Sequence, residues 1–237
     1  MPKFIILSGP SCIGKGPLLE ALRRVYPKLT FGQPVRYTSR IMRPGERDGV
    51  EFHFRSATDI RALPPEQFFV YPMRNQWQAL DLNELDGLFC RYERIITECY
   101  PPVLLSLLEH PRIIKDSIGF AIRTVFITPI SDQEITELAE QTPRPLTEII
   151  ADIMRAKQIR RAVNQGKLLS AEELDDIDVR AGQAHGEMQY RRLYSDVIVN
   201  HDGEDSDNWR STPPRGDAGR TLHALARIMR SDEHMRT

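Results

Sequence analysis

The residues best suited to chemistry form a short glycine-containing stretch near the start of the chain. It reads Gly9-Pro10-Ser11-Cys12-Ile13-Gly14-Lys15, with an apolar run at 4–7 before it and a helix-like stretch at 18–24 after it. In such a strand-to-helix turn, glycines let successive backbone N–H groups converge on one anion, and a lysine reaches the outer phosphates. The stretch, together with Gly16, therefore predicts a phosphate-binding loop.

One position of this loop departs from the usual pattern. Phosphate loops carry Ser or Thr after the lysine, and its hydroxyl ligates Mg²⁺. Here Gly16 and then Pro17 follow Lys15. We expect Mg²⁺ to accompany the bound phosphates, but the sequence assigns it no ligand.

Composition restricts the partners and the compartment. The 33 acidic and 32 basic residues of the 237-residue chain nearly cancel, so neither nucleic acid nor an anionic membrane is an expected partner. The chain has three cysteines, and their spacing is not that of metal ligands. An odd number of such cysteines is typical of reduced thiols. No stretch is long and apolar enough to span a bilayer. We expect a cytoplasmic protein, a monomer or homodimer, acting on small molecules.

Strand-like and helix-like segments alternate along the chain. The apolar patterns predict strands at 3–8, 35–38, 50–54, 67–71, 103–108, 124–128 and 197–199. They predict helices at 17–26, 57–63 and 81–97, from Ser131 onward, and at 146–164, 171–193 and 217–230, with a polar loop at 200–217. Ser170 and Glu173 form a capping-box pattern. This order predicts an α/β fold with a parallel sheet flanked by helices.

Two further segments carry a family resemblance. Residues 37–54 contain Thr38-Ser39-Arg40 followed by Arg43-Pro44-Gly45-Glu46. Residues 194–200 contain the last apolar strand of the chain, and Asn200 follows that strand. With the phosphate loop before them, these segments resemble the guanylate kinase family of P-loop nucleoside monophosphate kinases. The resemblance covers most of residues 3–230 and is weak in 71–130.

The resemblance implies a single domain over residues 1–237 with three parts. The kinase core would comprise 1–32, 100–130 and 186–237. An acceptor-binding insert would span 33–90, and a helical lid would span 131–185, with an additional helical hairpin at about 156–179.

The resemblance also implies roles for individual residues. ATP would lie on the loop, with Lys15 between its phosphates and with Asn200 and Asp202 near the adenine. The residues implied in acceptor binding are Thr38, Arg40, Arg43, Phe52, Tyr37 and Asp81. Besides Lys15, the residues implied in catalysis are Arg180, Arg155 and Arg144.

Departures from the family pattern leave the acceptor open. The guanine-reading Glu of the family falls at Val70, and its Asp-x-Asp strand end falls at Leu105-Ser106-Leu107. A hydrophobic side chain cannot accept from the guanine ring, so a substitute acid such as Glu51, Asp81 or Glu109 would be needed. The expected reaction is ATP + GMP to ADP + GDP. The alternatives are a kinase for another nucleotide or a sugar phosphate, and a non-catalytic guanylate-kinase-like binding module.

Overall fold

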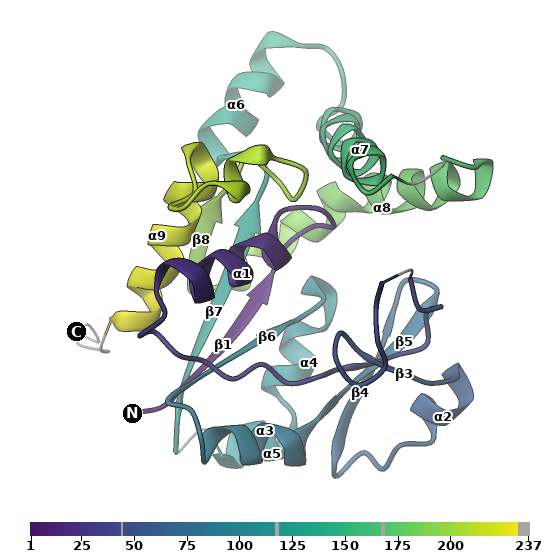
Figure 1. Ribbon diagram of the computed structural model, residues 1–237. Helices are drawn as coiled ribbons and strands as arrows, with labels where there is room; N and C mark the ends of the chain where they lie inside the picture. Colours follow the sequence, from purple (N-terminus) through teal and green to yellow (C-terminus); the bar gives the residue numbers. More distant parts are fainter. Residues whose placement is uncertain (44, 117–118, 167–168, 232–237) are drawn as a thin grey trace. The chain divides into compact units, whose positions relative to one another are not determined.

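The computed structural model describes residues 1–43, 45–116, 119–166 and 169–231 (Figure 1). Pro44 of the Arg-Pro-Gly-Glu segment and residues 167–168 of the expected lid hairpin lie outside these ranges. The chain divides into two compact units: unit 1 comprises Met1–Ile6 and Thr30–Arg123, and unit 2 comprises Leu7–Leu29 and Thr124–Thr237. Each unit is described by itself below.

The larger sheet has the strand order β6-β1-β7-β8. These strands are β6 (Arg94–Glu98), β1 (Lys3–Ser8), β7 (Ala121–Thr128) and β8 (Asp196–Val199). Every residue of β1 is buried, as its continuous apolar run requires, and β1 lies in the sheet interior as predicted. β7 and β8 pair in parallel, from Val125 opposite Asp196 to Thr128 opposite Val199. The α/β class and the parallel pairing are confirmed.

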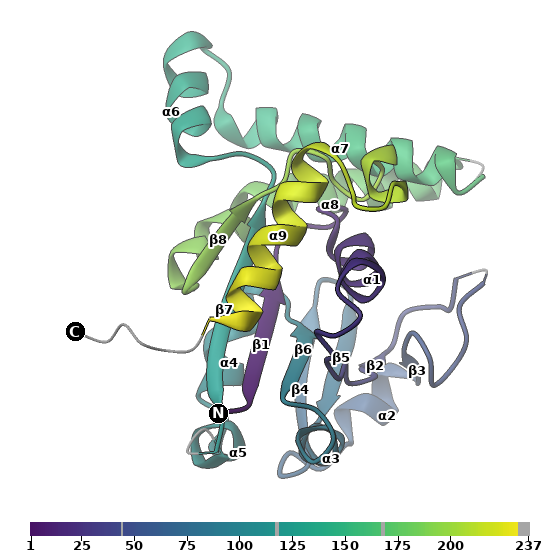
Figure 2. The same ribbon diagram turned by 60° about the vertical axis from the view of Figure 1, so that its left-hand side comes forward.

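Helices of unit 2 pack along its strands and against one another (Figures 1 and 2). The amphipathic helix α9 (Gly216–Arg230) packs on β8 and on α1 (Lys15–Val25). The capping box at Ser131 starts α6 (Asp132–Gln141), and the predicted box at Ser170 starts α8 (Ala171–Gln189). α7 (Leu146–Asn164) lies alongside α8 in both views. Two 3₁₀ turns, η2 (Tyr190–Leu193) and η3 (Asp207–Arg210), complete the unit.

Unit 1 contains a second sheet with the order β3-β2-β5-β4. The strands are β2 (Tyr37–Thr38), β3 (His53–Phe54), β4 (Phe68–Met73) and β5 (Gln76–Asp81). β4 and β5 form an antiparallel hairpin that places Val70 opposite Ala79 and Tyr71 opposite Gln78. The sequence analysis missed β5, because the turn at Arg74 adopts a positive φ of 55° without the Asn-Gly or Asp-Gly pair that marks most tight hairpins. The helices here include α2 (Ala57–Arg61) and α3 (Leu82–Phe89).

The segment from 81 to 108 differs from the prediction. The expected helix 81–97 ends with α3, and residues 94–98 form β6, whose Ile95-Ile96-Thr97 run is β-branched and suits a strand. The expected strand 103–108 is wrong. Residues 101–103 form the 3₁₀ turn η1 (Pro101–Val103), which leads into α4 (Leu104–Leu108) and then α5 (Pro111–Asp116). Prolines at a helix start and a run of leucines, which are not β-branched, favour a helix.

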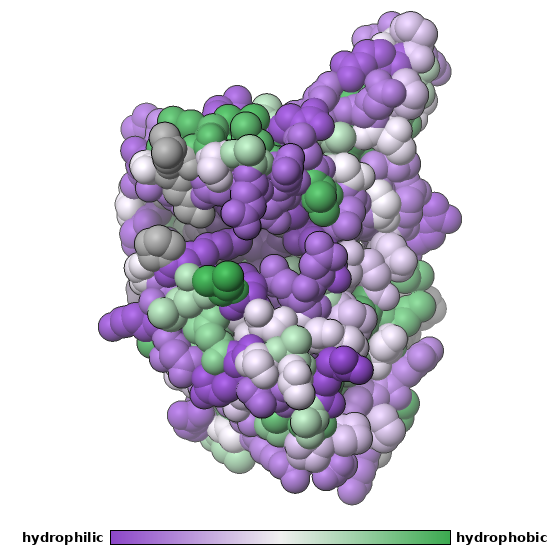
Figure 3. Space-filling model, turned by 90° about the vertical axis from the view of Figure 1, so that its right-hand side faces the viewer, coloured by the Kyte–Doolittle hydropathy of each residue, from purple (hydrophilic) through white to green (hydrophobic). Residues whose placement is uncertain are grey.

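Hydrophilic residues predominate on the face shown in Figure 3, with hydrophobic residues in small separate groups. This face offers charged and polar contacts rather than one extended apolar surface. Among the described residues, the structure contains no helix whose length and apolar character would let it cross a membrane.

Candidate active site

The phosphate loop of unit 2 has the backbone that its sequence predicts. Gly9 and Gly14 adopt φ values of 144° and 97°. A Cβ at Gly9 would lie 2.3 Å from the backbone oxygen of Ile127, so any larger residue would displace the loop from β7. Lys15 begins α1, and its Nζ donates to the carbonyl oxygens of Gly9 and Pro10 at 2.9 and 3.1 Å. The lysine charge is therefore held over the loop, at the N-terminus of a helix.

Cys12 lies in the middle of this loop and is buried. Its Sγ donates to the carbonyl oxygen of Lys157 on α7 at 3.5 Å, and burial raises the pKa of the thiol to about 12. The thiol is therefore neutral near pH 7 and acts as a packing residue rather than as a nucleophile.

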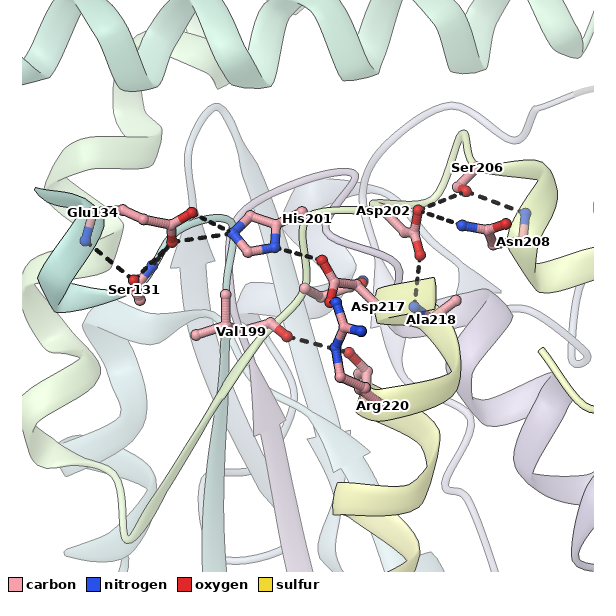
Figure 4. Close-up of polar contacts among 12 residues, drawn as sticks. Ser131, Glu134, Val199, His201, Asp202, Ser206, Asn208, Asp217, Ala218 and Arg220 are labelled. Carbon is pink, nitrogen blue, oxygen red and sulfur yellow. Dashed lines mark hydrogen bonds and ion pairs between the residues drawn. The ribbon is translucent and has the colours of Figure 1, made fainter. Parts of the chain in front are cut away.

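The segment that follows β8 stabilises the phosphate loop through a side-chain hydrogen bond. Asn200 is fully buried, and its Nδ2 donates to the carbonyl oxygen of Ile13 at 2.7 Å. Asp202 accepts from Asn208 Nδ2 at 2.8 Å and from the backbone N–H of Ala218 at 2.7 Å (Figure 4). Both side chains thus have structural partners, and their expected place near adenine stays a prediction.

His201, between these two residues, lies between two carboxylates (Figure 4). Its Nε2 is 2.9 and 3.0 Å from the carboxylate oxygens of Glu134, at the start of α6, and its Nδ1 bonds Asp217, at the start of α9. Both ring nitrogens can donate only when the imidazole is protonated. Burial alone would lower the pKa of His201, but the hydrogen bonds to both acids outweigh it and raise that pKa.

The surroundings of Gly16 indicate which residue could bind Mg²⁺. No group of three or more His, Cys, Asp or Glu side chains within the described ranges could form a metal cage. A Cβ at Gly16 would lie 3.6 Å from Glu204 Oε1, and Glu204 Oε2 accepts from Arg161 at 2.7 Å. Mg²⁺ in nucleotide sites is usually bound by one or two carboxylates together with substrate phosphates. Glu204 fits that role, because its carboxylate lies within contact distance of any side chain placed at position 16.

The arginines expected in the lid form ion pairs with acids of α7 and α8. Arg144 bonds Asp152 at 2.6 Å, and Arg155 bonds both Asp152 and Asp178 at 2.6 Å. Arg180 pairs with an acid one turn earlier on α8, Asp176. Arg144 and Arg155 thus share one acid, Asp152. The catalytic role of all three stays a prediction.

The acceptor segment of unit 1 is organised by Arg40 and Glu46. The Arg40 guanidinium makes a bidentate pair with the Glu46 carboxylate at 2.7 and 2.6 Å. Glu46 Oε2 also accepts from the backbone N–H of Arg43 at 2.8 Å. Arg40 lies over the Phe52 ring, with 4.9 Å between its guanidinium carbon and the ring centroid. Phe52 therefore holds the guanidinium from one side through a cation–π contact.

The other expected acceptor residues have mixed roles in this unit. Thr38 is fully buried, and its Oγ1 accepts from the backbone N–H of Arg40 at 3.4 Å. Tyr37 packs on His53, with ring centroids 4.6 Å apart. Asp81 accepts from the backbone N–H groups of Asn83 and Glu84 at 2.8 and 3.1 Å and so caps α3. Asp81 has a structural use that its prediction as an acceptor ligand did not anticipate.

Comparison with known proteins agrees with this arrangement. The family model for guanylate kinase matches residues 1–71. The guanylate kinase of Mycolicibacterium paratuberculosis is 30% identical over 164 residues, which cover 68% of this chain and 69% of that protein. This chain belongs to the guanylate kinase family. The guanylate kinase of Helicobacter hepaticus is 27% identical over 203 residues, which cover 84% of this chain and 82% of that one.

A solved structure shows that the fold of this guanylate kinase family member extends beyond the region that the family model matches. The guanylate kinase from Anaplasma phagocytophilum superposes with a TM-score of 0.55 and 16% identity, over 97% of this chain and 87% of that one. The family assignment made from the three motifs is confirmed.

Sequence reasoning missed two acids of this family member. Glu98 ends β6 and lies 3.7 Å from Arg36, but the incorrect strand at 103–108 directed attention to Leu105 instead. Glu204 lies in a polar loop where the sequence offers many acids. The β-branched run Ile95-Ile96-Thr97 was the available signal for Glu98, whereas no local pattern marks Glu204.

Proposed function

We propose that this chain is an ATP-dependent nucleoside monophosphate kinase that transfers the terminal phosphate of ATP to a phosphate-bearing acceptor, with GMP as the acceptor. The observation that carries the proposal is the loop geometry, in which two glycines at positive φ place Lys15 over the loop carbonyls at a helix N-terminus. The relatives that it resembles are guanylate kinases.

The chemistry follows from charge and position. Phosphoryl transfer needs alignment and neutralisation of charge far more than covalent catalysis. Lys15 would exchange its loop carbonyls for the donor phosphates. Arg40, already held on Phe52 and oriented by Glu46, would bind the acceptor phosphate in a bidentate manner. Arg144, Arg155 and Arg180 would bring further positive charge from the lid.

Mg²⁺, when bound, would offset the negative charge of the nucleotide phosphates. Glu204 is the side chain of this chain that we assign to it, because its carboxylate lies beside Gly16. Asn200 would keep the loop in its binding conformation through its bond to the Ile13 carbonyl.

The test is ADP formation from ATP and Mg²⁺ with GMP, AMP, CMP, UMP or ribose 5-phosphate, each corrected for the rate without acceptor. We expect turnover with GMP to exceed that with every other acceptor. Faster turnover of another nucleotide or of the sugar phosphate would establish the alternative kinase. GMP binding without ADP formation would establish the non-catalytic module.

A further inference from the structure

One face of α7 contacts the loop that follows β8 within unit 2. The contacting residues are three or four positions apart, so they project from the same side of the helix. We call them the α7 stripe: Lys157, Arg160, Arg161 and Asn164. At one end of the stripe, Lys157 Nζ donates to the carbonyl oxygen of His201, and at the other end Asn164 Nδ2 donates to that of Asp205 at 3.3 Å. The stripe therefore joins α7 to the loop over its whole length.

The two arginines in the middle of the stripe take neighbouring acids of the loop. Arg160 Nε donates to Asp205 Oδ2 at 2.6 Å, and Arg161 Nη1 donates to Glu204 Oε2 at 2.7 Å. The Arg160 side chain is 63% exposed, whereas that of Arg161 is 15% exposed. Water and salt screen a shielded charge less, so the pair of Arg161 with Glu204 should hold its geometry firmly.

Glu204 is also fixed to the phosphate loop through its backbone, since its N–H donates to the carbonyl oxygen of Cys12 at 2.9 Å. Gly203 before it has a φ of 61°, and a Cβ there would lie 3.0 Å from that same oxygen, so this turn requires glycine. The two carboxylate oxygens of Glu204 have different surroundings. Oε2 accepts from Arg161, and Oε1 lies 3.6 Å from the place of a Cβ at Gly16. One oxygen is thus bonded to α7, and the other lies beside the phosphate loop.

We propose that Arg161 is a positioning residue for Mg²⁺ binding, because it holds the Glu204 carboxylate with one oxygen beside Gly16. This inference rests on the proposed function, since it concerns the residue assigned there to Mg²⁺. Carboxylates that ligate metals are themselves hydrogen-bonded, and loss of such a partner typically lowers metal affinity by about ten- to a hundredfold. The phosphate loop has Gly16 in place of the usual Ser or Thr. An acid oriented from α7 takes the place of that hydroxyl, and metal binding then depends on the contact between α7 and the loop.

The neighbouring acids of the loop are not placed to share this role. Asp202 is bonded on both carboxylate oxygens, Oδ1 by Asn208 Nδ2 and Oδ2 by the backbone N–H of Ala218. The Asp205 side chain is 4% exposed, so an ion has little access to it. The Glu204 side chain is 29% exposed, which leaves it accessible. Glu204 is therefore the acid of this loop whose orientation matters for a metal at Gly16.

ADP binding, measured by calorimetry with Mg²⁺ and with EDTA, tests the inference without turnover. We call the ratio of the two affinities the Mg²⁺ factor, and we expect Mg²⁺ to tighten binding to the wild type. Arg161→Met should lower the Mg²⁺ factor by up to about tenfold, while metal-free binding changes by less. Glu204→Gln should lower it as well. Because Arg161 acts through Glu204, the double variant should show no further loss than Glu204→Gln alone.

Arg160→Met is the matched control, because it breaks the neighbouring ion pair of the same helix and loop and leaves the pair of Arg161 with Glu204 in place. It should leave the Mg²⁺ factor unchanged, even if it lowers the melting temperature. Melting curves of every variant report whether unit 2 is folded. Arg161→Gln is shorter and uncharged and should also lower the factor, so it decides the question if Arg161→Met does not fold.

Several results would overturn the inference. Equal weakening of ADP binding with and without Mg²⁺ in Arg161→Met would show a direct contact between Arg161 and the nucleotide. A larger Mg²⁺ factor in that variant would show that Arg161 competes with the metal for Glu204. A wild-type factor of one, an equal fall in Arg160→Met, or additive losses in the double variant would also contradict it. Failure of the proposed function would appear differently, as the expected Mg²⁺ factors with no ADP formed from ATP and any acceptor.

Discussion

The phosphate loop of unit 2 and the acceptor segment of unit 1 are built by contrasting means. The loop is built from consecutive residues, and its lysine is held by backbone carbonyls at 2.9 and 3.1 Å. The acceptor segment holds its arginines through side chains, Arg40 through Glu46 and Arg36 through Glu98, with Phe52 between them. Backbone geometry thus preorganises one site, and ion pairs preorganise the other. A substitution should therefore affect the chemical step in the first and acceptor binding in the second.

Lys15→Ala gives the largest expected effect. Removing a charge that is aimed at the developing negative charge should lower kcat by roughly two to three powers of ten or more. The fold should persist, because Lys15 Nζ contributes only two bonds to carbonyls at the loop surface. Steady-state kinetics and melting temperature together measure both effects. Lys28→Ala, an exposed lysine beyond the end of α1, is the control. Retention of wild-type kcat by Lys15→Ala would mean that the loop is only structural.

Arg40→Ala comes next and should act on acceptor binding. Charge-assisted contacts to phosphate are worth about 1.5–3 kcal/mol, so affinity for the acceptor should fall by roughly ten- to a hundredfold. Because the contact is to phosphate, binding of GMP and binding of ribose 5-phosphate should weaken to the same extent. Arg43→Ala should also lower the affinity for the acceptor.

Arg55→Ala is the control for Arg40, since Arg55 lies in the same unit, is 43% exposed and pairs with Asp48 at 3.0 Å. It should leave acceptor affinity unchanged. If Arg40→Ala and Arg55→Ala behave identically in calorimetry, the pair with Glu46 is a structural contact and not a phosphate grip.

The smallest expected effect concerns His201 and stability. The raised pKa of His201 stabilises the fold fully below its unfolded value of about 6.5, and this contribution is lost as pH rises through the folded pKa. Burial would raise the pKa of Glu134, but hydrogen bonds to Ser131 and His201 lower it to about 2. The stability that the Glu134 carboxylate contributes is therefore lost as pH falls below about 4. The stabilisation should therefore be greatest at about pH 5–6.

Melting temperatures of the wild type and of His201→Gln between about pH 4 and pH 9 measure this contribution. We expect about 1 kcal/mol or less, because the side chains of His201 and Glu134 are 44% and 39% exposed. The difference should shrink at the alkaline end. His185→Gln is the control, because the ring of His185 bonds Gln189 rather than a carboxylate. A difference that stays constant across this range would show that the ring packs without carrying charge.

Local patterns predicted the elements whose residues lie close together in sequence. The buried run of β1, the glycines of the loop, the helix start at Ser131 and the capping box at Ser170 all depend on residues a few positions apart. Such features depend on backbone sterics and on hydrogen bonds between neighbours, which the order of residues specifies directly. They sufficed for the fold class and, with the Arg-Pro-Gly-Glu segment, for the family.

Other features depended on which segments meet in space. By hydropathy, the leucines within 103–108 suit a buried strand and a helix equally well. They form a helix in the structure, where prolines precede them and β6 takes the place in the sheet. Glu98 and Arg36 are far apart in the chain, as are Glu204 and Gly16, so only the folded backbone joins them. The sequence by itself determined the phosphate loop, because contiguous residues build it. Only the tertiary structure decided which acids lie beside it and beside Arg36, because those contacts close long loops whose ends no local pattern specifies.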